Sequence, residues 1–190
     1  DRELGAVVMG GPQDQEIAEE LSAALGDRAI SLAGRLSFRA SAAAMSHVIC
    51  YVGNDKIGRF FEDAMQEVGV KPVVFHGDIS SGTARAIISP DGERTFATHL
   101  GAGAMLNDTL LTQEIFRGWD YCFIEGYLIA NRTLVKKTIE LAKNAGCKII
   151  IDFASYNVVE ENRDFLIEIL PDIDIVFANE EEAKSLTNST

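Results

Sequence analysis

Residues 172–183 read Asp-Ile-Asp-Ile-Val-Phe-Ala-Asn-Glu-Glu-Glu-Ala, and this stretch decides the fold. The apolar run at residues 175–178 predicts a short strand, and Asn179 with the three glutamates after it predicts the start of a helix. Asn179 is a favourable helix N-cap, and Glu182 stands three positions later, where a capping box places a glutamate. Open α/β sheets also bind ligands where strands end and helices begin. The spacing alone favours capping for Asn179 and Glu182, and a ligand site is the alternative.

Helical and β patterns alternate in the chain before this stretch. Apolar strands are predicted at residues 121–125 and 148–153. Amphipathic helices are predicted at residues 13–25, 131–146 and 159–170, with a short one from 107 or 108 to 116. The two strands are apolar throughout rather than alternating, which is typical of a parallel sheet covered on both faces by helices.

The middle of the chain has a different pattern. Residues 82–89 and 94–100 are rich in β-forming residues, and Ser-Pro-Asp-Gly-Glu joins them at 89–93. This turn sequence predicts an antiparallel hairpin that lies beside the parallel sheet and not within it. Before the hairpin, a strand is predicted at 48–52 and a helix at 57–68. The helix is expected to turn five side chains inward: Phe60, Phe61, Ala64, Met65 and Val68.

The composition indicates a globular protein. The chain has 190 residues, of which 47% are hydrophobic and 24% charged, enough for one sizeable domain with a core. No apolar run approaches the roughly 20 residues of a membrane span, and no secretory signal opens the chain. Its three cysteines lie in apolar strand-like runs, which favours reduced thiols and a cytoplasmic location.

Charge and metal-ligating residues exclude two further classes of function. The net charge of −12 argues against a nucleic-acid polymer as partner, because binding phosphates along a polymer needs a basic surface. A single nucleotide remains compatible with this charge, since helix N-termini and Mg²⁺ can hold its phosphates. No cysteine or histidine pair has metal-ligand spacing, so we expect no zinc site.

Four segments resemble the PfkB/ribokinase-like family of carbohydrate kinases. Residues 52–61 (Val-Gly-Asn-Asp-Lys-Ile-Gly-Arg-Phe-Phe) resemble the family's Val-Gly-x-Asp-x-x-Gly signature, and 89–96 (Ser-Pro-Asp-Gly-Glu-Arg-Thr-Phe) resemble its lid hairpin. Residues 152–157 (Asp-Phe-Ala-Ser-Tyr-Asn) are similar to a segment of the adenosine-kinase-like branch. Residues 174–183 contain the family's Asn-x-x-Glu motif. Together the four segments cover roughly residues 47–190.

The resemblance implies a ribokinase-like, Rossmann-like α/β fold: a parallel sheet flanked by helices, with a small β lid at about 82–100. The chain would be a single domain over 1–190, incomplete at its C-terminal side. The implied activity is transfer of the ATP γ-phosphoryl group to a hydroxymethyl group of a sugar or nucleoside. ATP and Mg²⁺ are the implied cofactors, with Asn179 at the cofactor and Glu182 at Mg²⁺ through water.

The chain also departs from the family pattern. The family's catalytic base is an aspartate in a later Asp-Thr-x-Gly-Ala-Gly-Asp segment, and residues 98–104 (Thr-His-Leu-Gly-Ala-Gly-Ala) share only three residues with it. We expect Gly101 and Ala102 to line the sugar pocket where the chain leaves the lid. Residues 1–46 lack the family's substrate-binding aspartate and asparagine in a recognisable place. The sequence is therefore expected to be an incomplete or locally altered copy of a longer kinase, with the catalytic base beyond it.

Two carboxylates follow neighbouring strands and are candidate substrate ligands. Glu125 ends the strand at 121–125, and Asp152 lies at the end of the next strand. Each could equally be a cap or a solvated group, but two at adjacent strand ends favour a ligand-facing acidic patch.

Two rival functions remain. A non-catalytic α/β module that binds a sugar or nucleoside, a pseudo-kinase or truncated fragment, is the alternative that the absent base favours. A nicotinamide-dependent oxidoreductase is disfavoured, because no Gly-x-Gly-x-x-Gly follows a strand. Exposed edges of the lid hairpin make a homodimer through the lid a further expectation.

Overall fold

The computed structural model describes residues 6–8, 19, 23, 29–31, 47–90 and 94–188. The chain divides into two compact units, residues 1–34 with 107–190 and residues 35–106. The lid hairpin belongs to the second unit, and a single domain over 1–190 stays a prediction. Among the described helices, none combines the length and the apolar character needed to cross a membrane.

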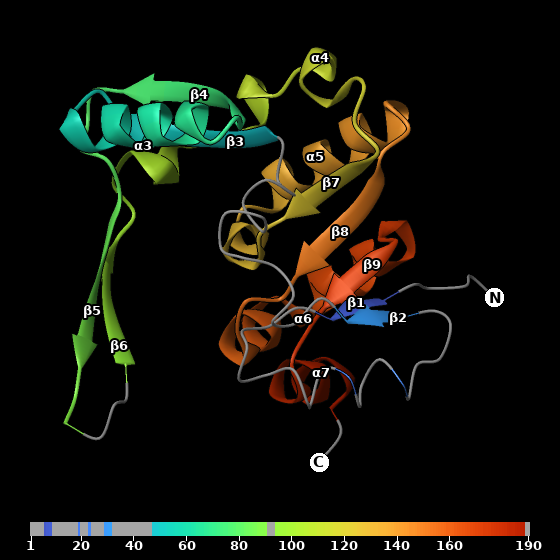
Figure 1. Cartoon of the computed structure of the whole chain (residues 1–190). Helices are drawn as coiled ribbons and strands as arrows, with labels where there is room; N and C mark the ends of the chain where they lie inside the picture. The colour runs from blue at the N-terminus through green and yellow to red at the C-terminus, as the bar shows by residue number, and fades with distance from the viewer. Residues whose placement is uncertain are drawn as a thin grey trace. The chain divides into compact units, whose positions relative to one another are not determined.

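A parallel three-stranded sheet organises the first unit (Figure 1). Its strands are β7 (Tyr121–Ile124), β8 (Lys148–Asp152) and β9 (Ile175–Phe177), in the order β7-β8-β9. The register pairs Ile124 with Ile151 and Asp152 with Phe177, so all three strands run out at the same edge. A separate parallel pair, β1 (Ala6–Val8) and β2 (Ala29–Ser31), belongs to the same unit. The strands predicted from their apolar runs are confirmed.

Helices precede, connect and follow these strands. They are α4 (Gln113–Phe116), α5 (Arg132–Asn144), α6 (Tyr156–Ile169) and α7 (Glu180–Thr187), with the 3₁₀ helices η4 (Asp108–Leu110), η5 (Gly126–Ala130) and η6 (Leu170–Asp172). Asn131 and Ser155 cap α5 and α6 through their side chains. The chain leaves α5 through Gly146 with φ +88°, the left-handed conformation that glycine allows at a helix end.

The core lies on one face of this sheet. Ile149 and Ile151 of β8 are fully buried. The helix residues that pack in this core, Val135 of α5 and Val159 and Leu166 of α6, are at most 1% exposed. This continuous burial of apolar side chains supplies most of the drive to fold the unit.

Side chains on the opposite face of the sheet are less covered. Tyr121 and Phe123 of β7 alternate with the inward residues and are 56% and 51% exposed. The predicted cover of both faces is therefore seen on only one face in the described part of the chain.

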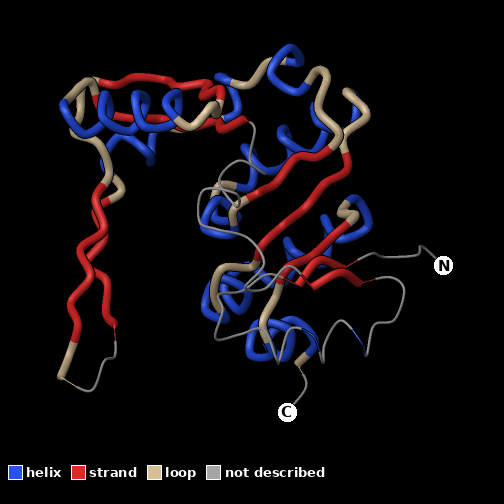
Figure 2. Tube along the Cα trace, in the orientation of Figure 1, coloured by secondary structure: helices blue, strands red, loops and turns tan. Residues whose placement is uncertain are grey.

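The second unit contains a parallel pair of strands and an antiparallel hairpin (Figure 2). The pair is β3 (His47–Gly53) and β4 (Lys71–Gly77), joined through α3 (Lys56–Glu67). The hairpin is β5 (Thr83–Ile88) with β6 (Arg94–His99), followed by the 3₁₀ helix η3 (Gly101–Met105). The predicted hairpin is confirmed, while its turn at 91–93 lies outside the described residues, as does almost all of the helix expected at 13–25.

Three details differ from the sequence prediction. The helix expected to reach Phe116 is two short pieces, η4 and α4, because Leu111 and Thr112 between them are extended. Helix α6 begins at Tyr156 instead of 159, since Ser155 supplies the cap. Of the five side chains expected to face inward from α3, Phe60 and Val68 are exposed, by 73% and 41%.

Substitutions of two isoleucines of α6, one buried and one exposed, test where the core lies. Ile169 is 4% exposed and Ile167 is 47% exposed, on the same helix. Ile169→Ala is expected to lower the free energy of unfolding by about 2–5 kcal/mol, because it removes buried methyl groups and leaves a cavity. Ile167→Ala is the matched control, with an expected loss of about 0.5 kcal/mol. Urea denaturation measures both, and equal losses would contradict this account of the core.

Candidate functional site

The carboxyl ends of β7, β8 and β9 bring four of the predicted site residues to one edge of the sheet. Glu125 follows β7 directly, Asp152 is the last residue of β8, and Asn179 follows β9 by two residues and starts α7. Glu182 lies in the first turn of α7. This is the edge of a parallel sheet where ligands bind in open α/β proteins.

Glu125 and Asp152 are electrostatic neighbours. Glu125 is exposed overall, but its carboxyl group is partly screened from water. This burial raises the pKa of the carboxyl group, and the negative charge of Asp152 raises it further. The Glu125 Oε2 accepts a hydrogen bond from Tyr127 N at 3.0 Å, which opposes part of the rise. Asp152 Oδ1 accepts one from Ala154 N at 3.2 Å. Both side chains cap the turns that follow their strands, and each keeps one oxygen outside these bonds.

Asn179 and Glu182 form a complete capping box. Asn179 Oδ1 accepts from Glu182 N at 2.9 Å, and Glu182 Oε2 accepts from Asn179 N at 2.9 Å. The Asn179 Nδ2 also donates to Glu182 Oε1 at 2.8 Å. Glu182 is 4% exposed although its side chain is polar. The predicted capping role is confirmed, and the role of either residue at a cofactor stays a prediction.

The oxygen atoms of Glu182 at the start of α7 suit a hydrated magnesium ion better than one that has lost its waters. Both Glu182 oxygens already accept hydrogen bonds from Asn179, and the described residues contain no group of three or more histidine, cysteine or acidic side chains that could hold a metal. Mg²⁺ commonly keeps several of its waters in proteins. The residues present therefore fit contact through water and not direct coordination.

Gly101 and Ala102 lie in the other unit, at the base of the lid. Gly101 has φ +52°, and a Cβ there would lie 2.4 Å from Ser80 O. Ala102 is fully buried, and its backbone N donates to Ser80 O at 2.8 Å. The structure holds both residues in a tight turn, and their predicted place in the sugar pocket stays a prediction.

A strained turn beside the carboxylates was not predicted from the sequence. Ala154 has φ +61°, which is unfavourable for a residue with a Cβ, and Ser155 N donates to Phe153 O at 2.7 Å across it. Gly126 packs against this turn so closely that a Cβ there would lie 2.3 Å from Asp152 O. Gly126 after a strand is the only sequence signal for this close approach.

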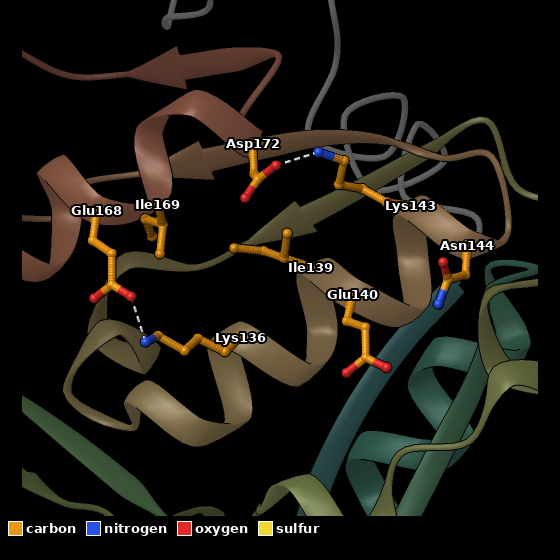
Figure 3. A pocket seen from close by; sticks show the side chains of 8 residues that line it. All are labelled: Lys136, Ile139, Glu140, Lys143, Asn144, Glu168, Ile169 and Asp172. Carbon is orange, nitrogen blue, oxygen red and sulfur yellow. Dashed lines mark hydrogen bonds and ion pairs between the residues drawn. The ribbon is translucent and has the colours of Figure 1, made fainter.

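A surface groove between α5 and α6 is lined by other side chains (Figure 3). It encloses about 420 Å³, and ion pairs cross it from Lys136 to Glu168 and from Lys143 to Asp172. Four of its five charged side chains neutralise each other in these two pairs, and the fifth, Glu140, pairs with Lys137 outside the lining. None of the predicted site residues lines the groove. The groove is therefore not the candidate site.

Comparison with solved structures shows the same fold. The adenosine kinase from Sinorhizobium meliloti superposes with a TM-score of 0.70 and 20% identity, over 98% of this chain and 59% of that one. The Anopheles gambiae adenosine kinase gives 0.70 and 16%, over 97% and 58%. A protein described as a ribokinase II from E. coli, in complex with ATP and Mg²⁺, gives 0.67 and 20%, over 81% and 55%. The chain thus spans less than two thirds of each of these proteins, and the predicted ribokinase-like fold is confirmed.

Comparison with families gives a match over most of the chain. No curated protein matches the chain significantly. The family described as pfkB family carbohydrate kinase matches residues 29–190, which include both strand-end carboxylates and the capping box. The chain belongs to the pfkB family of carbohydrate kinases.

Proposed function

We propose that the complete protein transfers the γ-phosphoryl group of ATP to a hydroxymethyl group of a sugar or nucleoside. The observation that carries this proposal is the pair of carboxylates at adjacent strand ends, close enough that Asp152 raises the pKa of Glu125. Carboxylates that keep a free oxygen accept hydrogen bonds from hydroxyl groups, and sugars and nucleosides are rich in hydroxyls. Family membership supports the same class of substrate.

The residues divide into two sets in this proposal. Glu125 and Asp152 bind hydroxyls of the phosphate acceptor, and the backbone of Gly101 and Ala102 is proposed to contact the sugar as well. Asn179 and Glu182 would act at the nucleotide: Glu182 would hold Mg²⁺ through water, and the start of α7 would favour the anionic phosphates. When bound, Mg²⁺ would neutralise charge on the triphosphate, which is the main electrostatic requirement of phosphoryl transfer.

A nucleoside is the first substrate class to test. Residues 152–157 are similar to the adenosine-kinase-like branch, and two of the structural neighbours are described as adenosine kinases. The experiment incubates the complete protein with Mg·ATP and adenosine, ribose or fructose, and measures ADP. Formation of ADP that depends on the acceptor supports the proposal. Binding of an acceptor without ADP would favour the non-catalytic module instead.

We also propose a cytoplasmic location. Cys50, Cys122 and Cys147 all carry free thiols. Burial raises the pKa of Cys50 to about 11 and that of Cys122 to about 12. Thiols that stay protonated are unreactive, as befits structural cysteines in a reducing compartment.

Glu182→Gln separates capping from a role at the metal. Glutamine can keep the capping-box bond from Asn179 N, but its amide NH2 would then face the Asn179 Nδ2 donor, so the free energy of unfolding is expected to fall by about 1 kcal/mol, the worth of one hydrogen bond. Loss of the charge is expected to raise the Mg²⁺ concentration for half-maximal activity by about tenfold, the worth of one charged hydrogen bond. Glu181→Gln, an exposed neighbour on α7, is the control. An unchanged Mg²⁺ dependence would return Glu182 to capping alone.

Glu125→Gln tests the raised pKa as well as the acceptor site. A carboxyl group whose pKa is raised by folding makes the protein less stable as the pH rises from the group's ordinary pKa of 4.5 through its pKa in the folded protein. The variant is therefore expected to be more stable than the wild type at pH 7, and this difference should vanish below pH 4. In the same protein the KM for the acceptor is expected to rise by about tenfold.

Thermal melts between pH 3.5 and 7.5 and steady-state kinetics measure these two effects. Glu161→Gln, exposed on α6, is the control. A destabilised variant at pH 7 would contradict the electrostatic account of Glu125, and an unchanged KM would remove it from the acceptor site.

We further propose that the lid hairpin pairs with a second copy of the chain. Ile87, Ile88 and Phe96 are 61%, 68% and 59% exposed, and two-stranded hairpins are marginal on their own. Light scattering after size exclusion should give a dimer for the wild type and a monomer for Ile88→Asp. A wild-type monomer at about 1 mM, a concentration at which a pairing free energy of about −4 kcal/mol would already give dimers, would rule the pairing out.

A further inference from the structure

One carboxylate holds the base of the lid to the rest of its unit. Asp55 Oδ1 accepts from Gly58 N at 2.9 Å, which caps α3, and also from Ser81 Oγ at 2.8 Å. Asp55 Oδ2 accepts from Ser81 N at 2.8 Å. Ser81 lies two residues before β5, where the chain enters the hairpin. The side chain of Asp55 is thus a helix cap on one side and an anchor for the lid on the other.

The serine in this arrangement is fully engaged. Ser81 is 4% exposed, and its Oγ donates to Asp55 while accepting from Gly53 N at 2.9 Å. The hydroxyl therefore links the end of β3 to the start of α3 as well as to the lid. Hydrogen bonds from Gly58 N, Ser81 N and Ser81 Oγ lower the pKa of Asp55 from 3.8 to about 2. The carboxylate stays charged, and its bonds persist, until the pH falls toward that value.

Backbone contacts join the two arms of the hairpin at the same place. A Cβ on Gly53 would lie 2.4 Å from Ser81 N, and one on Gly82 would lie 2.6 Å from Leu100 O. The returning arm is tied as well, because Ala102 N donates to Ser80 O at 2.8 Å. These approaches leave no room for side chains, so the base is packed backbone against backbone.

The hairpin beyond this base has a different environment. Ala84, Ala86 and Ile88 of β5 are exposed, as are residues 95–99 of β6. The burial that fixes Ser81 and Ala102 ends within three residues along each arm. A segment with few buried contacts opens at low free energy, whereas the base does not.

We propose that Asp55 locks the base of the lid, so that the hairpin bends beyond Gly82 and Leu100 while its two attachment points stay fixed. The lock keeps Gly101 and Ala102 in place whether the lid is open or closed. The purpose of this arrangement rests on the proposed function, but the lock itself does not require a substrate.

Hydrogen exchange read by mass spectrometry tests the lock in the complete protein without any ligand. Asp55→Ser keeps a favourable N-cap for α3, but the shorter side chain no longer reaches Ser81. We expect exchange in peptides covering 79–83 and 100–106 to become at least about tenfold faster, because Ser81 N and Ser81 Oγ both lose their hydrogen bonds to the charged carboxylate. Exchange in the first turn of α3 should stay within about twofold of the wild type. Asp63→Ser, exposed on the same helix, is the control.

Ser81→Ala gives an independent test that leaves the cap untouched. It removes the hydroxyl between Asp55 and Gly53, and it is expected to accelerate exchange in the same two peptides. If Asp55→Ser does not fold, this variant decides alone. Unchanged exchange at 79–83 and 100–106 would overturn the lock, and so would an increase confined to residues 57–60, which would leave Asp55 as a cap. A failed kinase assay leaves this result unaffected.

Discussion

The fold of the first unit depends on one strand. β8 pairs with β7 on one side and β9 on the other, so its backbone groups are satisfied in both directions. Its two central isoleucines, Ile149 and Ile151, are fully buried at the same time. Because the pairing is parallel, fixing β8 fixes where its neighbours end, and Glu125, Asp152 and Asn179 follow those ends. These three polar side chains are thus grouped at one edge by the register of the strands, and not by contacts among the side chains themselves.

Much of this fold could be predicted from the sequence, because its strands and helices carry strong local signals. Continuous apolar runs marked β7, β8 and β9, and the Pro-Asp-Gly turn marked the hairpin. The errors arose where tertiary contacts override local pattern. Phe60 belongs to an apolar helical face and is nevertheless exposed, and the start of α6 depended on a single serine whose capping role has no apolar signature.

The candidate site was predictable in its residues but not in its geometry. The sequence could place Glu125 and Asp152 at strand ends, and register then brought them together. It could not indicate that both oxygens of Glu182 are held by Asn179, nor that Ala154 adopts a positive φ, because neither residue type requires these states. Asp55 caps α3 through its bond from Gly58 N. Its second partner, Ser81, is 26 positions away, and such a contact leaves no periodic trace in a single sequence.

The division of the chain into units also constrains how the protein is made. Residues 35–106 form a unit that is continuous in sequence, whereas the other unit combines 1–34 with 107–190. During synthesis the continuous unit is complete before strands β7, β8 and β9 of the other unit have left the ribosome. Domains generally fold as units, and those nearer the N-terminus fold first. The early unit, once folded, shortens the flexible loop that the discontinuous unit must close, and so lowers the entropy cost of closing it. The lid-bearing unit would then act as an internal folding aid for the sheet that carries the carboxylates.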